Sequence, residues 1–381
     1  PQMCEVVVRE RVSALVIDMA LLHLVTELEH EVPVIVAGLD DDDSREAPAS
    51  ADVEAHTLAE VRARGQGGRP LRASMPVPPV LLTSGTTGTP KGAQRSNRVD
   101  PAAATGLIDR IPYRHDDVVA ITSPLFHAWG FAQLLLASSL GATVALTEAF
   151  DADATLAQIE RERVTVLAVV PAILQRLLAS PSLDTTDLSS LRIVASSGSA
   201  LPVPVVEEWI DRVGPNLYNL YGSTEVGQAT LATPDMLSIE PGTAGRALPG
   251  STIAIVDDRG DEVPIGEIGR IFVGNGAQFD RYTGGGGKEI VRGLMSSGDV
   301  GYLTDDGLLF VTGRADDMIV SGGENVFPRE VEDLLLAHRD IDDVAVVGVD
   351  DAEFGQRLVA YVVLRDGCTL SATAVKRLVS T

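Results

Sequence analysis

Cysteine, aromatic residues and positive charge are all scarce in this chain of 381 residues. Its two cysteines, Cys4 and Cys368, lie near opposite ends, which excludes a disulfide framework and fits a reducing compartment. No apolar run reaches the ~20 residues that a membrane-spanning helix needs. The chain begins at Pro1 with neither the basic nor the apolar region of a signal peptide. We therefore expect a cytoplasmic protein with no transmembrane segment, and peripheral contact with a membrane stays open.

Acidic residues far outnumber basic ones. There are 54 Asp and Glu against 30 Lys and Arg, giving a net charge of −24. This excess argues against a nucleic-acid partner, because it would repel the phosphate backbone. An anionic small molecule can still bind, since salt screens the overall field over ~8 Å. Such a site should be a local loop rich in glycine or backbone N–H groups. The rest of the composition, with 45% hydrophobic and 22% charged residues, is globular.

Strand-like and helix-like runs alternate between residues 117 and 221. Strands are predicted at 117–124, 142–147, 164–170, 191–196 and 216–221, and helices at 129–140, 153–163, 172–180 and 203–213. This alternation predicts βαβ units and a mostly parallel sheet. Before this region, the polar residues 40–75 predict a solvated loop flanking a short helix.

Two further regions follow. Between residues 250 and 313 the helical pattern is absent, and short β runs at 251–256, 268–273 and 308–312 predict a β-rich subdomain. Beyond residue 317, helices are predicted at 328–338 and from 371, with β runs at 344–349 and 358–364 between them. We therefore expect an α/β protein. Its large domain would span 1–315, with the β-rich part at about 245–315, and a small α+β domain would span 316–381.

The most informative segment is a loop rich in hydroxyls and glycine that follows a predicted strand at 79–83. It reads Thr83-Ser84-Gly85-Thr86-Thr87-Gly88-Thr89-Pro90-Lys91-Gly92. Its N–H and hydroxyl groups can surround an anion, and Lys91 adds a positive charge. A P-loop of the Walker type has Gly-Lys followed by Ser or Thr, whereas Lys91 stands between Pro90 and Gly92. An ordinary flexible loop is the alternative, but the density of these residues favours a triphosphate site of another kind.

This loop resembles the signature loop of the adenylate-forming superfamily, which comprises acyl-CoA synthetases, luciferases and the adenylation domains of peptide synthetases. Further segments resemble the family's motifs in the same order: 196–202, 219–225, 241–249, 297–299, 312–314 and 318–332. Ser297 stands where threonine is commoner in the family. The resemblance implies a large adenylation domain followed by a small hinged C-terminal domain. It also implies that full-length members extend beyond this chain at both ends, with the catalytic lysine beyond Thr381.

The resemblance implies a nucleotide site. Tyr221 would stack on adenine, Asp299 would bind the ribose, and Arg314 would supply a second ribose contact. Thr86 and Glu225 would hold Mg²⁺, although an ordinary surface carboxylate is the alternative for Glu225. The nucleotide-binding residues would be Thr83, Ser84, Gly85, Thr86, Thr87, Gly88, Lys91, Ser197, Gly198, Ser199, Ala200, Asn219, Leu220, Tyr221, Gly222, Ser223, Thr224, Asp299 and Arg314.

The catalytic residues implied are Lys91, His127 and Glu225. His127, Gly198, Gly322 and Gly323 would contact the acyl group or CoA, and Asp316 would be the hinge. A histidine packed in the core is the alternative for His127, which follows the predicted strand 117–124 and is flanked by Phe126 and Ala128-Trp129.

A second glycine-rich segment, Gly284-Gly285-Gly286-Gly287-Lys288, also suggests a phosphate site. No strand-to-helix context surrounds it, so a surface loop is favoured.

The activity implied by the resemblance is ATP-dependent activation of a carboxylic acid to an acyl-AMP, with release of pyrophosphate and then transfer to CoA. The form of the segment Gly322–Pro328 is similar to that of fatty-acid and aryl-acid CoA ligases, and we expect a fatty-acyl-CoA synthetase of lipid metabolism. The substrates would be the acid, ATP with Mg²⁺, and CoA. Two alternatives stay open: an acyl-AMP ligase that loads an acyl carrier protein, and a non-catalytic remnant that binds nucleotide.

Overall fold

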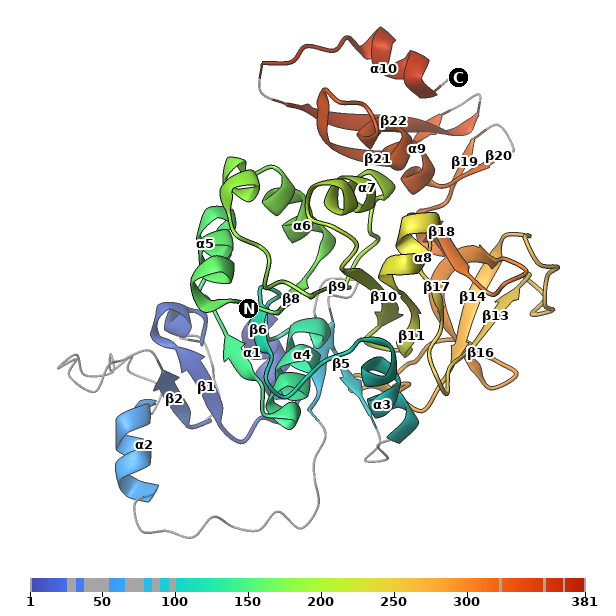
Figure 1. Cartoon of the computed structure of the whole chain (residues 1–381). Helices are drawn as coiled ribbons and strands as arrows, with labels where there is room; N and C mark the ends of the chain where they lie inside the picture. Colours follow the sequence, from blue (N-terminus) through green and yellow to red (C-terminus); the bar gives the residue numbers. More distant parts are fainter. Residues whose placement is uncertain are drawn as a thin grey trace. The chain divides into compact units, whose positions relative to one another are not determined.

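The structure is a computed structural model that describes residues 2–25, 32–37, 55–65, 79–83, 90–95, 101–321, 324–351, 354–365 and 367–379. The chain divides into two compact units. The first contains Pro1–Asn97 and Asp280–Gly287, and the second contains Arg98–Phe279 and Lys288–Thr381. Figure 1 labels their helices and strands. Among the described residues, no helix has both the length and the apolar character needed to cross a bilayer.

The described part of the first unit forms two small three-stranded sheets. One is parallel, in the order β1-β2-β3, and the other is antiparallel, in the order β15-β5-β4. The elements are α1 (Gln2–Arg9), β1 (Leu15–Asp18), the 3₁₀ helix η1 (Met19–Val25), β2 (Val34–Ala37), β3 (Ala55–Thr57), α2 (Leu58–Gly65), β4 (Leu81–Thr83), β5 (Lys91–Gln94) and β15 (Arg281–Tyr282). The short helix expected within 40–75 is α2, and the rest of that expected loop lies outside the described residues, apart from β3.

The second unit is built on a seven-stranded sheet with the order β12-β11-β10-β9-β8-β6-β7. Its strands are β6 (Val118–Ile121), β7 (Thr143–Ala145), β8 (Val166–Val169), β9 (Ile193–Ser196), β10 (Leu217–Ser223), β11 (Gly227–Ala232) and β12 (Arg246–Ala247). The strands from β7 to β10 pair in parallel, and β11 and β12 continue the sheet antiparallel. Every residue of β8 and β9 is buried, as expected for strands covered on both faces.

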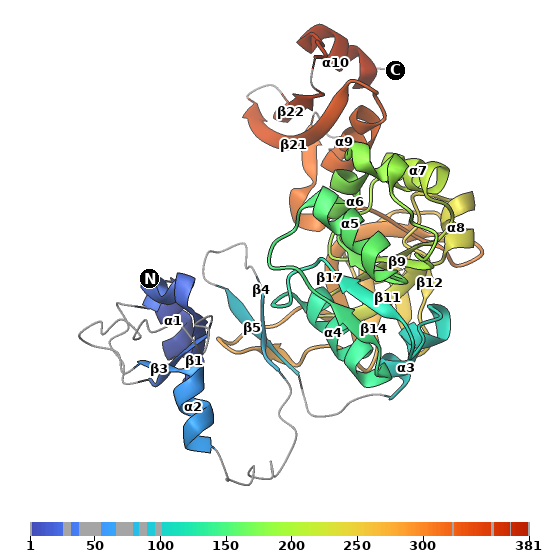
Figure 2. The same cartoon turned by 60° about the vertical axis from the view of Figure 1, so that its left-hand side comes forward.

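Helices cover both faces of this sheet (Figures 1 and 2). They are α3 (Pro101–Arg110), α4 (Ala128–Leu140), α5 (Ala152–Glu162), α6 (Pro171–Leu178), α7 (Val203–Arg212) and α8 (Pro234–Ile239), with the 3₁₀ helix η2 (Pro181–Thr185). One core packs α5, α6 and α7 on the sheet, and a second packs α3 and α4 on its other face. Local signals set the ends: the Asp151 carboxylate accepts from the N–H of Ala154 to begin α5, and Gly141 ends α4 at φ 74°.

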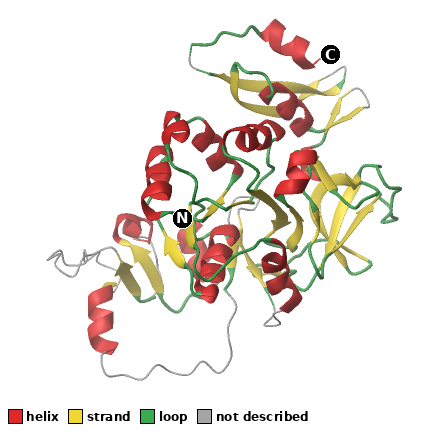
Figure 3. Cartoon of the chain, viewed as in Figure 1, coloured by secondary structure: helices red, strands yellow, loops and turns green. Residues whose placement is uncertain are grey.

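A β-rich layer follows, without α-helices between residues 250 and 313 (Figure 3). It consists of β13 (Thr252–Val256), β14 (Gly269–Gly274), β16 (Ile290–Val291), β17 (Leu294–Leu303) and β18 (Leu309–Arg314). The C-terminal segment, here called the cap, then forms a four-stranded sheet in the order β20-β19-β22-β21. After the short η3 (Ala315–Asp317), its elements are β19 (Ile319–Ser321), β20 (Glu324–Val326), α9 (Pro328–Leu336), β21 (Ile341–Asp351), β22 (Gly355–Leu364) and α10 (Ala372–Val379).

The predicted fold class is confirmed: the chain is α/β, with a β-rich part and a small α+β C-terminal part. Each strand and helix predicted between 117 and 221 is present, with its ends shifted by a few residues. The sequence did not predict that the sheet continues past β10 into two antiparallel strands. Residues 227–232 are buried along both sides, so they lack the alternation that marks a half-exposed strand.

Candidate functional site

Strand β10 carries the motif Asn219–Ser223 to the carboxyl edge of the large sheet, where ligands bind in open α/β sheets. A tight turn then leads into β11. Gly222 is required there, because a β-carbon on it would lie 2.1 Å from the carbonyl oxygen of Gly227. The turn therefore holds Tyr221 on one side and Glu225 on the other in fixed positions.

Tyr221 is hydrogen-bonded to the carboxylate that the sequence assigns to ribose. Its hydroxyl donates to Oδ2 of Asp299 at 2.6 Å, and Nη1 of Arg314 donates to Oδ1 at 3.2 Å. Asp299 and Arg314 face each other across the β17–β18 pair. Burial, together with the neighbouring carboxylate, raises the pKa of the Tyr221 hydroxyl well above its usual value. The hydroxyl thus stays protonated and acts as a donor.

The backbone before Asp299 is set by Ser297. The Ser297 hydroxyl is buried, donates to the carbonyl of Ile271, and accepts from the N–H of Asp299 at 3.0 Å. Gly298 between them has φ 88°, a conformation that glycine adopts readily. Serine, in the place where the family has threonine more often, therefore supplies a hydroxyl that fixes the turn.

The turn after β9 lies beside β10. The Ser197 hydroxyl donates to the carbonyl of Leu220 at 2.9 Å, and this bond ties the turn to the strand that carries Tyr221. Gly198 follows at φ 99°, and a β-carbon there would already lie 3.4 Å from Val170. Ser199 and Ala200 after it are exposed.

These segments enclose one cavity of about 840 Å³ in the second unit. The sequence-predicted residues that line it are Gly198, Ser199, Ala200, Asn219, Leu220, Tyr221, Gly222, Ser223, Asp299, Arg314 and Asp316. Ser197, Thr224, Glu225 and His127 do not line it. Residues from six separate motifs of the sequence thus meet at one site: 196–202, 219–225, 241–249, 297–299, 312–314 and 318–332.

The cap contributes residues that sequence reasoning did not single out: Arg329, Glu332, Gly348 and Gln356 line the same cavity. The Arg329 side chain, on α9, donates to the carbonyls of Val311 and Leu201, both at 3.2 Å. The guanidinium therefore joins the cap to the β-rich layer and to the turn after β9. Arg329 lay within the motif 318–332, but a contact to Leu201 leaves no signal in the sequence.

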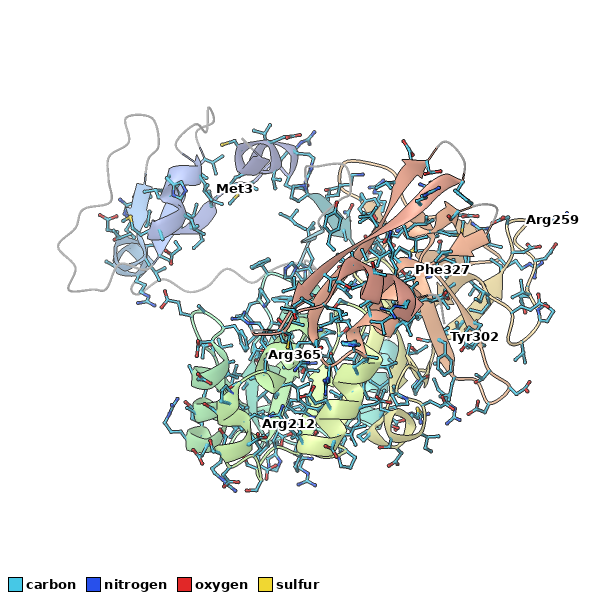
Figure 4. The ribbon with its side chains drawn as sticks, turned by 90° about the horizontal axis from the view of Figure 1, so that it is seen from above. Met3, Arg212, Arg259, Tyr302, Phe327 and Arg365 are labelled. Atoms are coloured by element: carbon cyan, nitrogen blue, oxygen red, sulfur yellow. The ribbon has the colours of Figure 1, made fainter. Side chains whose placement is uncertain are left out.

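A second contact of the cap involves Phe327, which is labelled in Figure 4. This ring is 6% exposed, and a β-carbon on Gly313 would lie 3.2 Å from it. The glycine between Thr312 and Arg314 therefore leaves room for the ring of Phe327.

Glu225 is half-buried in the turn after β10. Its Oε2 accepts from the Ser223 hydroxyl at 3.0 Å, and its carbonyl accepts from the N–H of Phe279 at 2.7 Å. No group of three or more His, Cys, Asp or Glu that could hold a metal occurs among the described residues. A single carboxylate nevertheless fits Mg²⁺, which is usually held by one or two carboxylates together with substrate phosphates.

His127 occupies the N-cap position of α4 without a side-chain capping hydrogen bond, and its side chain is exposed. Its ring lies 4.4 Å from that of Phe126, centroid to centroid, and Phe126 is 72% exposed. The buried aromatic residue of this segment is Trp129, whose Nε1–H donates to the carbonyl of Val169. The alternative of a histidine packed in the core is therefore wrong, and the role of His127 at the acyl site stays a prediction.

In the first unit, the strands β4 and β5 flank the hydroxyl-rich loop, and Thr83 pairs with Lys91. Lys91 is half-buried, and its Nζ lies 5.7 Å from the centroid of the Tyr282 ring. A β-carbon on Gly92 would lie 2.7 Å from the side chains of Thr283 and Val80, so glycine is required there. Ser84 to Gly88, including Thr86, and Gly322 and Gly323 lie outside the described residues, as does the side chain of Thr83.

Comparison with known proteins identifies the class. A family model described as "AMP-binding enzyme" matches residues 2–283, and one described as "AMP-binding enzyme C-terminal domain" matches residues 330–381. The chain therefore belongs to the AMP-binding enzymes of the adenylate-forming superfamily.

Among its relatives is an indoleacetate–CoA ligase of Aromatoleum aromaticum, 40% identical over 310 residues, which cover 80% of this chain and 61% of that protein. Another is the fatty acid–[acyl-carrier-protein] ligase ScoC of Streptomyces coeruleorubidus, 32% identical over 75% of this chain and 57% of that protein. The chain thus spans about three-fifths of the length of these relatives. Among solved structures, the amide bond synthetase McbA from Marinactinospora thermotolerans superposes with a TM-score of 0.82, at 28% identity, over 99% of this chain and 75% of that one.

Proposed function

We propose that this protein activates a carboxylic acid with ATP and then transfers the acyl group to CoA. The observation that carries the proposal is the cavity lined by the turn after β9, strand β10, the pair Asp299–Arg314 and the cap. In the first step a carboxylate oxygen attacks the α-phosphorus, forming acyl-AMP and expelling pyrophosphate. In the second step the CoA thiolate attacks the acyl carbon, and AMP leaves.

The residues of the cavity would bind the nucleoside. Asp299 would accept hydrogen bonds from the ribose hydroxyls, with Tyr221 and Arg314 fixing its two oxygens. The turn 197–200 would border the adenine, and Thr224 would follow toward the phosphates. Because charge develops on phosphoryl oxygens during the first step, a fixed cation lowers its barrier. Lys91 would supply that charge beside the loop 83–88, which would bind the triphosphate.

Mg²⁺ would be held by Glu225 and the loop hydroxyl of Thr86, and would neutralise phosphate charge when bound. The carboxylate of Glu225 is kept in place by its bond from Ser223, so it is presented in one orientation. His127 would border the acyl group. Gly322 and Gly323 would border CoA, and Asp316 in η3 would be the hinge between a domain over 1–315 and the cap over 316–381.

The identity of the acid and the identity of the acceptor each have two candidates. An indoleacetate–CoA ligase and a fatty acid–[acyl-carrier-protein] ligase are both relatives, so an aryl acid and a fatty acid are both candidates. Transfer to an acyl carrier protein is the second candidate function, because of the relative ScoC. A cytoplasmic location and a role in lipid metabolism stay predictions.

The test is to identify products. The full-length protein is incubated with ATP, Mg²⁺ and each acid of a panel of aryl and fatty acids, with CoA or an acyl carrier protein as the acceptor. Mass spectrometry should detect acyl-AMP without an acceptor, and an acyl thioester with equimolar AMP when the right acceptor is present. Formation of ADP in place of AMP, or no acyl product from any acid, would contradict the proposal.

A further inference from the structure

Two cations meet over the turn that precedes the proposed ribose carboxylate. The position that a β-carbon on Gly298 would take lies 3.1 Å from Nη2 of Arg314 and 3.3 Å from Nζ of Lys288. All of these groups belong to the second unit. The Lys288 ammonium and the Arg314 guanidinium are therefore neighbours above one glycine.

Only one of these two cations has carboxylate partners among the described residues. Arg314 pairs with Asp299 at 3.2 Å and with the exposed Asp316 at 3.7 Å. For Lys288, the ion pairs and hydrogen bonds of the described residues include none. Asp299 is also the acceptor for Tyr221, so its charge is shared among several donors. Two neighbouring like charges repel each other, and an anion between them would remove that cost.

We propose that Lys288 and Arg314 together bind a phosphate group of ATP, an inference that rests on the proposed function. Arg314 lines the cavity with Asp299 and Tyr221, where the ribose would bind. The triphosphate chain is attached to that ribose, so the proposed reaction brings this anion into the same site. A lysine ammonium binds phosphate as a compact charge, and an arginine guanidinium binds it through paired N–H donors.

A surface loop is expected from the sequence at residues 284–288, and the four glycines agree with this expectation. All four are exposed, and a β-carbon on Gly285, Gly286 or Gly287 would meet nothing within 4 Å. Lys288 differs, because it is half-buried and its Nζ lies next to the turn of Asp299. The phosphate contact is therefore made by the lysine after the loop and not by the glycines.

The test compares Lys288→Gln with Arg292→Gln, which removes the same charge from the neighbouring turn, where Arg292 pairs with Asp261 at 2.9 Å. The dissociation constants of ATP, AMP and adenosine are measured calorimetrically for both variants and the wild type. Lys288→Gln should raise the dissociation constant of ATP about tenfold, as expected for the loss of a hydrogen bond between charged groups. The dissociation constant of adenosine should stay unchanged, and Lys288→Arg should restore the affinity for ATP. Arg292→Gln should change none of the three.

If Lys288→Gln raises the dissociation constants of adenosine and ATP equally, or changes neither of them, Lys288 does not contact a phosphate. An effect on the KM for CoA with ATP binding unchanged would also overturn it. Failure of the proposed function is a separate result, because it would show in the wild type as absence of any acyl-AMP. The result with AMP shows which phosphate is bound. Weaker binding of both ATP and AMP would mean that Lys288 contacts the α-phosphate, and weaker binding of ATP alone would mean that it contacts the β- or γ-phosphate.

Discussion

Replacing Tyr221 by phenylalanine tests the arrangement of the proposed ribose site. The change removes one hydroxyl and keeps the ring. Asp299 would lose the donor to its Oδ2, which lies 2.6 Å away, and would keep the bond from Arg314 to its Oδ1. A carboxylate can accept about four hydrogen bonds, so in the wild type two remain for the ribose hydroxyls. In the variant the carboxylate is held at one oxygen only.

The expected loss follows from the environment of this bond. A hydrogen bond to a charged group contributes about 1.5–3 kcal/mol. The side chain of Asp299 is 15% exposed, so water can replace part of the missing donor. We therefore expect Tyr221→Phe to lose an amount at the lower end of this range, about 1.5 kcal/mol of binding free energy, which corresponds to about a tenfold rise in the KM for ATP. The kcat should change less, because no reacting atom touches the hydroxyl.

The assay measures acid-dependent AMP formation at varied ATP and at varied 2′,3′-dideoxy-ATP. Since the dideoxy nucleotide has no ribose hydroxyls, the orientation of Asp299 no longer matters to it. Tyr221→Phe should therefore raise the KM for ATP and leave that for the dideoxy nucleotide nearly unchanged. Tyr302→Phe is the matched control (Tyr302 is labelled in Figure 4), since that ring stacks on Phe310. It should alter neither KM.

Two results would be incompatible with a Tyr221 hydroxyl that orients Asp299 toward the ribose. An unchanged KM for ATP would mean that Tyr221 does not orient the carboxylate. An equal loss with both nucleotides would mean that the hydroxyl acts on the packing of the site and not on the ribose.

Three further predictions concern other parts of the second unit. His127→Ala should raise the KM for the acid or slow thioester formation with ATP binding intact; equal loss of ATP binding in a titration would remove His127 from the acyl site. Arg329→Ala removes the hydrogen bonds from the cap to the carbonyls of Leu201 and Val311, so limited proteolysis should cleave the chain near residues 315–317 faster than in the wild type. Arg365→Ala is the control, because the Arg365 side chain donates to Ile341 within the cap; it should leave the rate of cleavage unchanged. Asp117→Asn should lower the free energy of unfolding by about 2 kcal/mol, since Asp117 is buried and receives bonds from Thr165 and Arg192. Burial raises the pKa of Asp117, but those bonds outweigh it and hold the pKa below its usual range. The stabilisation by the carboxylate is therefore present above pH ~4 and is lost as the pH falls through the pKa of the folded state. In urea unfolding, the free energies of unfolding of the wild type and the variant should become equal in acid.

The sequence predicted the local parts of the fold well, because their signals are local. Helix α5 has its Asp151 cap and an apolar stripe, and α6 begins at Pro171, so both could be placed from spacing and end signals. The hairpin β10–β11 was harder. Its glycines, Gly222 and Gly227, are explained by backbone contacts that only the folded structure shows.

Many of the residues that line the cavity are named by the sequence motifs, but the contacts between them are not predictable from those motifs. Tyr221 and Asp299 were both named from their motifs, yet 78 residues separate them and nothing in the sequence shows that they share a hydrogen bond. The same holds for Arg329 and Leu201, which are 128 residues apart. The lack of a strand-to-helix context around residues 284–288 argues against a phosphate loop, but it carries no information on the Lys288 side chain, whose Nζ lies beside the turn at Gly298. Such contacts depend on packing, which the sequence pattern does not encode locally.

We propose that an acyl-adenylate forms reversibly in the cavity around Tyr221, Asp299 and Arg314. Exchange of labelled pyrophosphate into ATP without CoA, measured in the presence and absence of acid, reports on this step alone. Exchange should occur only when an acid is present, and Asp299→Ala should lose the exchange while it retains the fold. Exchange that does not depend on acid, or ATP binding without exchange for every acid tested, would contradict it.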